Sequence, residues 1–251
     1  MVIFEGAAAG IRAAYQALFP QGCLSCQRRH GPFGPSGLCE NCLESLKLPP
    51  LNTCASCASP LDFTFEVDTG VEYFCGECRL NPPPFDYAKY ALSYEGPVRQ
   101  VIHEFKFGQS PYLAGPLAEM GKDRLAPWLA ARKDALIVPV PLHWRRLHWR
   151  GYNHAYLLAK KLADMAGLAV AEGALTRTRH TQHQFGLSRE ERGKNVKAAF
   201  TATRPEMLAG RDVIILDDII TTGATARECC DTVLKCEPNS VSIATLCKAG
   251  G

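Results

Sequence analysis

The 251-residue sequence lacks two features that would assign it at once to a common class of protein. It has no run of about 18 apolar residues, so no membrane-spanning helix is predicted. Its formal net charge is only +3, which argues against a general electrostatic coat for DNA and leaves local clusters as the candidate anion sites. Hydrophobic residues make up 47% of the chain, which is enough for a globular core.

The N-terminal segment lacks the basic region that precedes the apolar part of a secretory signal peptide. Its apolar residues Ile11, Tyr15, Leu18 and Phe19 indicate one side of a short amphipathic helix. A signal peptide is the alternative interpretation. We therefore expect a cytoplasmic protein, in which dense cysteines indicate metal binding instead of disulfides.

Cysteine, in contrast, is abundant and unevenly distributed among its 12 positions. All eight cysteines before residue 79 form C-x-x-C pairs, namely Cys23/Cys26, Cys39/Cys42, Cys54/Cys57 and Cys75/Cys78. Two such pairs supply four thiolates and close a tetrahedral site, so the sequence predicts about two structural zinc ions. Iron–sulfur binding is the alternative. We favour sequential pairing of the C-x-x-C pairs, and an interleaved pairing stays open.

A proline-rich connector, Pro82-Pro83-Pro84, follows the last cysteine pair and should be stiff. After it, strand patterns alternate with helix patterns. The expected strands are residues 88–94, 136–140, 213–216 and 241–246, and the expected helices are 97–107, 112–132, 152–166 and 224–235. Buried strands separated by helices imply an α/β domain with a parallel sheet. The sequence thus predicts two domains, 1–84 and 85–251, which the connector separates.

The remaining four cysteines lie in the second of these domains, in apolar surroundings typical of small buried hydrophobes. They are Cys229, Cys230, Cys236 and Cys247.

The stretch after the apolar run at 213–216 carries the most specific signal in the chain. Ligands of parallel sheets bind at the carboxyl ends of the strands, and this strand is followed by Asp217 and Asp218. The next residues, Thr-Thr-Gly-Ala-Thr at 221–225, open a helix whose backbone N–H groups and threonine hydroxyls can bind an anion. Carboxylates suit sugar hydroxyls, so the stretch describes a ribose 5-phosphate site. The alternative is a strand–turn–helix in which these residues serve as caps.

This stretch resembles, at every position, the phosphoribosyl pyrophosphate (PRPP) signature of type I phosphoribosyltransferases. The resemblance implies a parallel sheet with flanking helices, and magnesium bound together with PRPP. It assigns the ribose hydroxyls to Asp217 and Asp218. It assigns the 5-phosphate to Thr221, Thr222, Gly223, Ala224 and Thr225. No base-binding pocket is recognisable in the sequence, and no catalytic residue is assigned.

A second candidate anion site is HWRRLHWRGYNHA at residues 143–155, which follows the strand at 136–140 and contains no acidic residue. We expect an arginine-rich loop that faces the same crevice as Asp217. Guanidinium groups bind phosphate oxygens bidentately, so Arg145, Arg146 and Arg150 are candidates for pyrophosphate or DNA phosphate. The alternative is a solvated basic loop that opens the helix at 152–166.

Aromatic and basic side chains also suggest a contact with single-stranded DNA. Trp149 lies within the basic cluster, and Lys106 lies between Phe105 and Phe107. Stacking on aromatic rings combined with nearby cations is typical of single-strand binding. Lys106 and Trp149 are therefore candidate DNA contacts.

A third basic segment, residues 177–197, has few apolar residues and is expected to be a long, partly helical excursion. Long segments of this kind often act as lids over a ligand. In type I phosphoribosyltransferases, which it resembles in position, this region is the flexible loop that closes over PRPP. The alternative is a surface insert.

Nearly the whole chain resembles the ComF/GntX-type competence proteins, which join a double zinc ribbon to a phosphoribosyltransferase-like domain. The motifs that carry the resemblance are the Pro-Pro-Pro-Phe connector, Tyr-Glu-Gly-Pro at 94–97, the helix with His103 and Lys106, VPVPL with RGYNHA, and the PRPP motif. The resemblance implies a role in natural transformation, with handling of incoming single-stranded DNA in the cytoplasm.

Three functional hypotheses follow from these patterns. The first is a DNA-uptake factor with a true PRPP site and a surface for single-stranded DNA. The second is an active phosphoribosyltransferase that acts on an unknown nucleophile. The third is a scaffold whose zinc ribbons dock a helicase or another uptake protein, with PRPP as a regulatory ligand.

Overall fold

The computed structural model describes residues 22–28, 36–61, 71–179, 181 and 189–250. The expected N-terminal helix with Ile11, Tyr15, Leu18 and Phe19 lies outside these residues, as does most of 180–188 in the third basic segment. Within the described chain, no helix is long and apolar enough to cross a membrane.

A five-stranded sheet forms the centre of the molecule, in the order β1-β7-β6-β2-β3, and every neighbouring pair of strands is parallel. The strands are β1 (Tyr87–Ser93), β2 (Leu136–Pro139), β3 (Ala169–Val170), β6 (Asp212–Ile220) and β7 (Ser240–Lys248). Parallel strands that are covered on both faces consist of nearly continuous apolar residues. The apolar runs in the sequence therefore predicted the parallel α/β fold correctly.

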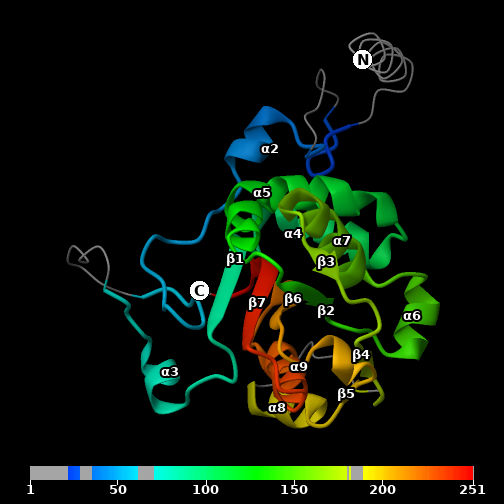
Figure 1. The fold of residues 1–251 in the computed structure, drawn as a ribbon. Helices are drawn as coiled ribbons and strands as arrows, with labels where there is room; N and C mark the ends of the chain where they lie inside the picture. Colours follow the sequence, from blue (N-terminus) through cyan, green and yellow to red (C-terminus); the bar gives the residue numbers. More distant parts are fainter. Residues whose placement is uncertain (1–21, 29–35, 62–70, 180, 182–188, 251) are drawn as a thin grey trace, which may run out of the picture.

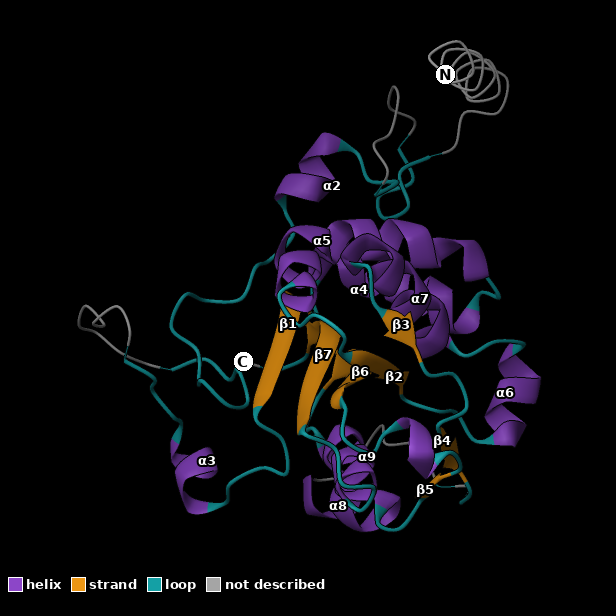
Figure 2. Cartoon of the chain, in the orientation of Figure 1, coloured by secondary structure: helices purple, strands orange, loops and turns teal. Residues whose placement is uncertain are grey.

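Helices cover both faces of this sheet (Figure 2). One face carries α4 (Gly96–Phe107), α5 (Ala114–Ala130) and α7 (His154–Ala166). The other face carries α9 (Ala224–Leu234) and α8 (Arg189–Val196), beside the antiparallel pair of β4 (Leu175–Arg177) and β5 (Phe200–Ala202). Five short helices complete the described structure: α2 (Glu40–Glu44), α3 (Gly76–Leu80), α6 (Trp144–Arg150) and the 3-10 turns at Pro111–Leu113 and Pro205–Met207.

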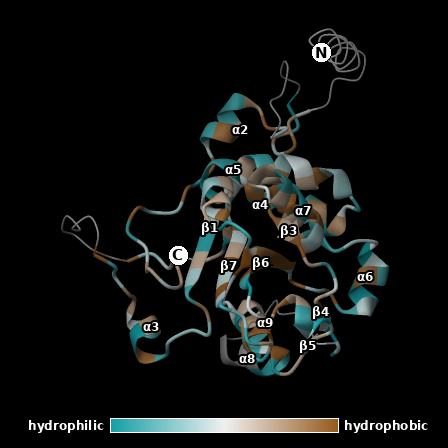
Figure 3. Cartoon of the chain, in the orientation of Figure 1, coloured by the Kyte–Doolittle hydropathy of each residue, from teal (hydrophilic) through white to brown (hydrophobic). Residues whose placement is uncertain are grey.

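The sheet divides the apolar interior into two cores, because successive side chains of a strand point to opposite faces. In β6, Ile214 and Leu216 pack with α4, α5 and α7, whereas Val213 and Ile215 pack with α9. Figure 3 shows hydrophobic colours at the centre of the sheet and mixed colours on the outlying helix α6 (Trp144–Arg150).

Two local expectations are wrong. Residues 144–150 form helix α6 and not a loop, because His143 caps its start by accepting from the Arg145 N–H at 3.3 Å and Gly151, at φ 80°, ends it. Strand β6 also continues past residue 216, through both aspartates to Ile220. Its pairing with β7 extends over the same residues, which keeps the chain extended there.

The segments on the two sides of the connector contact each other. The Ser56 carbonyl accepts a hydrogen bond from the Ala88 N–H of β1 at 2.6 Å, and Lys248 Nζ donates to the Cys57 carbonyl at 3.2 Å. Figure 1 shows the C-terminal end of the chain beside the segment around residues 50–60. A proline connector restricts its own backbone, but it does not prevent flanking segments from packing together.

Candidate functional site

A cleft of about 340 Å³ lies at the carboxyl ends of β2 and β6. It brings together the phosphoribosyltransferase-like motif and the basic cluster, as the strand-end rule predicts. The polar residues that line it are Lys106, Arg146, Arg150, Asn153, His154, Arg177, Asp217, Asp218, Thr221 and Thr225. We call the side formed by Asp217 and Asp218 the acid wall, and the side formed by Arg146, Arg150 and Arg177 the arginine wall.

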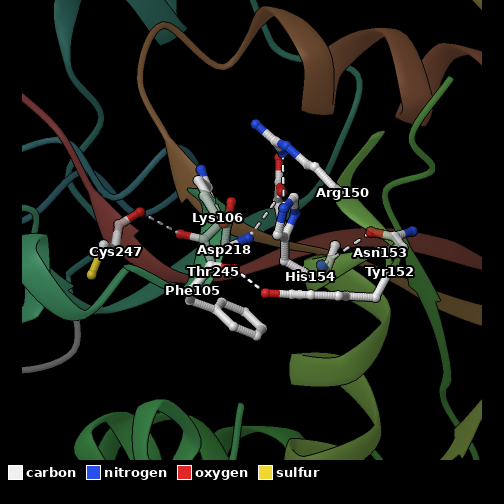
Figure 4. A network of polar contacts seen from close by, with 11 residues as sticks. Phe105, Lys106, Arg150, Tyr152, Asn153, His154, Asp218, Thr245 and Cys247 are labelled. Carbon is white, nitrogen blue, oxygen red and sulfur yellow. Dashed lines mark hydrogen bonds and ion pairs between the residues drawn. The ribbon is translucent and has the colours of Figure 1, made fainter. Parts of the chain in front are cut away.

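The acid wall is held by contacts within the protein. Asp217 Oδ1 accepts the Asp218 backbone N–H at 2.9 Å. Asp218 Oδ2 forms an ion pair with Lys106 Nζ, also at 2.9 Å, and Lys106 comes from the last turn of α4 (Figure 4). Asp218 is buried, so this cation replaces much of the solvation that its carboxylate loses.

The two carboxylates differ in their preference for a proton. Burial, together with the neighbouring Asp218 carboxylate, raises the pKa of Asp217 to about 8. Burial, the largest single influence, would raise the pKa of Asp218 as well, but the Lys106 ammonium, together with His154 and a hydrogen bond with Asp217, holds the pKa below its ordinary value. At neutral pH the pair therefore shares one proton, and Asp217 is the residue that favours it.

The segment at 221–225, which we call the phosphate loop, connects β6 to α9. Gly223 has φ 77° and caps α9, so the left-handed backbone explains the glycine at this position. Four of the five loop residues line the cleft: Thr221, Gly223, Ala224 and Thr225. Thr222 lines a second cleft on the outer side of the loop.

The arginine wall contains two of the three arginines expected from the basic cluster. Arg146 and Arg150 line the cleft, whereas Arg145 is not among the lining residues and is exposed. The Arg145 guanidinium instead lies 5.3 Å from the centre of the Trp144 ring. One helical turn separates Arg146 from Arg150, so both reach the same side of α6, and the adjacent Arg145 points elsewhere.

Sequence reasoning missed Arg177, the third member of this wall. It ends β4, is 5% exposed, and its Nε has no hydrogen-bond partner in the described structure. Its Nη2 donates to the Thr181 hydroxyl, and the Thr181 carbonyl accepts from Arg146 at 3.0 Å. Burial, followed by the repulsion of Arg146, lowers the pKa of Arg177 to about 10. Its position at a strand end was the signal available in the sequence.

His154 was also missed as a functional residue, although it lies within the RGYNHA motif. It is 3% exposed, and burial lowers its pKa to about 4. The neutral ring therefore accepts at Nε2 from Arg150 Nη1, at 2.8 Å (Figure 4). The Phe105 ring packs edge-on against it at 5.6 Å. His154 thus orients Arg150 in the cleft without adding a second positive charge.

Aromatic side chains lie at the mouth of the cleft. Phe107 lines it, and its ring centre lies 6.3 Å from that of Trp149. Trp149 is 62% exposed and Phe107 46% exposed. The Arg150 guanidinium lies 5.1 Å from the Phe107 ring centre. Lys106, the other candidate DNA contact, lies inside the cleft in the ion pair with Asp218.

The eight N-terminal cysteines form two separate groups, and the pairing is sequential. The first cluster is Cys23, Cys26, Cys39 and Cys42, and the second cluster is Cys54, Cys57, Cys75 and Cys78. Within each, all sulfur atoms lie within 4.8 Å of one another.

The geometry of both clusters suits zinc. Cys26 Sγ and Cys39 Sγ are 3.8 Å apart in the first, and Cys57 Sγ and Cys75 Sγ are 3.7 Å apart in the second. A tetrahedron with Zn–S bonds of about 2.3 Å has sulfur–sulfur edges of about 3.8 Å. The clusters are thus consistent with two structural zinc ions, each closed by four thiolates.

Three of the four late cysteines, Cys229, Cys230 and Cys247, are fully buried in the apolar interior, which confirms their prediction as small hydrophobes. Cys236 is half-buried at the end of α9.

Two family descriptions match the sequence: "Double zinc ribbon domain" over residues 14–79 and "Phosphoribosyl transferase domain" over residues 150–251. The DNA utilization protein YhgH of Escherichia coli (strain K12) is 33% identical over 226 residues, which cover 84% of this chain and 97% of that protein. Competence protein F of Haemophilus influenzae is 30% identical over 233 residues, which cover 90% of this chain and 96% of that protein. With a double zinc ribbon ahead of a phosphoribosyltransferase-type fold, and similarity along most of its length to these two proteins, the chain belongs to the ComF/GntX family.

Proposed function

We propose that the protein binds PRPP in the cleft and acts in DNA uptake, with single-stranded DNA as its partner. The observation that carries the PRPP assignment is the presence of the acid wall and the arginine wall in one cleft. The cleft offers carboxylates, which suit sugar hydroxyls, and guanidinium groups, which suit phosphate oxygens.

In this proposal Asp217 and Asp218 accept hydrogen bonds from the ribose hydroxyls. Thr221, Thr222, Gly223, Ala224 and Thr225 hold the 5-phosphate, through backbone N–H groups at the start of α9 and threonine hydroxyls.

The pyrophosphate is assigned to Arg146, Arg150 and Arg177 of the arginine wall. The Nε of Arg177 supports this assignment, because it has no hydrogen-bond partner in the described structure. A buried donor without a partner lowers the stability of the protein unless a ligand accepts its hydrogen bond. Magnesium accompanies the ligand, since carboxylate and phosphate oxygens are the donors that this ion prefers.

The DNA role rests on two independent supports. Relatives that match most of this chain carry the names DNA utilization protein and Competence protein F. The exposed rings of Phe107 and Trp149, with Arg150 beside them, offer a stacking surface at the cleft mouth. Phosphates of a single strand would then lie toward Lys106, Arg146 and Arg150.

We further propose that residues 1–84 and 85–251 are separate folding units despite their contacts, and that the protein acts in the cytoplasm. Limited proteolysis tests the boundary, because cleavage near Pro84 should leave a resistant C-terminal fragment.

Isothermal titration with PRPP and magnesium tests the site directly. We expect saturable binding of one PRPP per chain, and competition by pyrophosphate but not by chloride at equal ionic strength. Absence of PRPP binding by folded, zinc-loaded protein would overturn the proposal. Titration of fluorescent single-stranded DNA with and without PRPP then tests whether the two ligands share the arginine wall. Continuous release of pyrophosphate in the presence of DNA would favour the second hypothesis, an active transferase.

A further inference from the structure

We infer that Lys248 is a positioning residue through which the second cluster holds the phosphate loop in place. This deepens the proposed function, because it concerns the loop to which the 5-phosphate is assigned. It also gives the two clusters different roles: the second supports a ligand site, and the first supports the core alone.

On the cluster side, the half-buried Lys248 ammonium makes two hydrogen bonds. It donates to the Ser59 hydroxyl oxygen at 2.7 Å and to the Cys57 carbonyl at 3.2 Å. Ser59 Oγ in turn lies 3.1 Å from Cys57 Sγ. Four thiolates around one zinc ion carry a net charge of about −2, so a neighbouring cation is favoured there. Partners of this kind orient metal ligands and are costly to lose.

On the loop side, Lys248 lies opposite Ile220 in the pairing of β7 with β6. The next residue, Ala249, donates its N–H to the Ile220 carbonyl at 2.9 Å. Ile220 is the last residue of β6, and the phosphate loop begins directly after it. The lysine that contacts the second cluster is therefore paired with the strand end from which the loop starts.

A second cleft, of about 290 Å³, separates the cluster from the loop itself. Cys57, Ser59 and Cys75 line one side of it, and Thr222 and Gly223 line the other. The side chain of Lys248 also lines this second cleft. It therefore connects the second cluster to the strand end from which the phosphate loop starts.

The first cluster has a different environment and serves as an internal control. Ser25 within it donates to Gln100 of α4 at 2.6 Å, and Cys23 and Cys39 are buried in the core beside α4 and α5. None of its cysteines lines either of the two clefts.

Substitution of Lys248 tests the inference, with hydrogen exchange of residues 219–226 as a readout that needs no ligand. Lys248→Met should increase exchange in this segment and lower PRPP affinity at least fivefold, the low end of typical coupling between sites. Zinc content should stay at two ions per chain. Lys248→Arg, which keeps donors, should restore both properties. Ser59→Ala provides a milder test if Lys248→Met does not fold.

Zinc release provides the reciprocal measurement, because coupling between two sites acts in both directions. PRPP should slow the transfer of one of the two zinc ions to a chromogenic chelator. Cys26→Ser, in the first cluster, should leave that protected ion in place, and Cys57→Ser should remove it. Lys248→Met with wild-type exchange, wild-type affinity and PRPP-independent zinc release would overturn the inference. If the wild-type protein fails to bind PRPP while exchange still responds to Lys248→Met, the proposed function fails and the positioning role stands.

Discussion

The acid wall and the arginine wall line the same cleft but are stabilised in different ways. Asp217 and Asp218 already have partners within the chain, an N–H and a lysine. Arg150 and Arg177 form no ion pair in the described part of the chain, and their hydrogen bonds go to the neutral groups His154 and Thr181. In the proposed function, Arg150 and Arg177 can therefore take up an external anion directly, whereas Asp218 gives up an internal cation when it binds the ligand.

The largest effect should come from the acid wall. Asp217→Ala combined with Asp218→Ala should weaken PRPP binding by at least about 10- to 10²-fold, because both acceptors are lost and the hydrogen bond to the charged Asp218 alone contributes about 1.5–3 kcal/mol. Pyrophosphate should still bind to the intact arginine wall. Titration of both ligands checks this, with circular dichroism as the control for folding. Equal loss of both ligands would show that the walls do not act separately.

The arginine wall offers a comparison between adjacent residues of one helix. Arg146→Ala should lower the affinity for pyrophosphate and for PRPP by about tenfold, the effect of one charge-assisted hydrogen bond. Arg145→Ala, whose side chain is exposed and lies outside the cleft, should have the affinity of the wild type. Equal effects of the two variants in calorimetry would contradict the assignment of this wall.

The mouth of the cleft allows a similar comparison between two exposed tryptophans of α6. Trp149→Ala should weaken single-stranded DNA binding about fivefold, which corresponds to the loss of about 1 kcal/mol of stacking. Trp144→Ala should have little effect, since this ring packs beside His143 and Arg145, whereas the Trp149 ring lies beside Phe107, which lines the cleft. Fluorescence anisotropy with a labelled oligonucleotide measures both. A larger loss of DNA affinity for Trp144→Ala than for Trp149→Ala would indicate that the DNA binds to another face.

A further prediction, which needs no ligand, concerns stability and its dependence on pH. The pKa of Asp217 is about 8 in the folded protein against an ordinary value of 3.8, so the folded state binds more protons between these values. Wild-type stability should therefore fall as pH rises from about 4 to 8. The Asp217→Asn variant does not lose stability in this way. Its Tm should therefore exceed that of the wild type by a margin that grows from pH 5 to pH 8.5, by about 2–4 °C for each kcal/mol of stability that the wild type loses.

Thermal melts at several pH values check this expectation. The control is Asp231→Asn, at an exposed position of α9, whose Tm difference from wild type should not change in this way. A constant advantage for Asp217→Asn across the pH range would refute the shared proton.

The sequence predicted those features that depend on local pattern. Apolar runs located the strands, and the spacing of cysteine pairs indicated the two clusters, because these signals lie within short windows. Helix α6 was missed because its seven residues have no buried side chain to create a periodic pattern. The ion pair of Lys106 with Asp218 and the neutral acceptor role of His154 were also missed, since each depends on residues that only the fold brings together.

The ion pair between Lys106 and Asp218 also has a consequence for the speed of binding. If the sugar hydroxyl takes the place of the ammonium at Asp218 Oδ2, Lys106 must first move away from its position at 2.9 Å. Binding by this exchange occurs in two steps, so in stopped-flow traces the observed rate should reach a plateau at high PRPP concentration. Pyrophosphate, which bypasses Asp218 in our assignment, should give a rate that rises linearly with concentration.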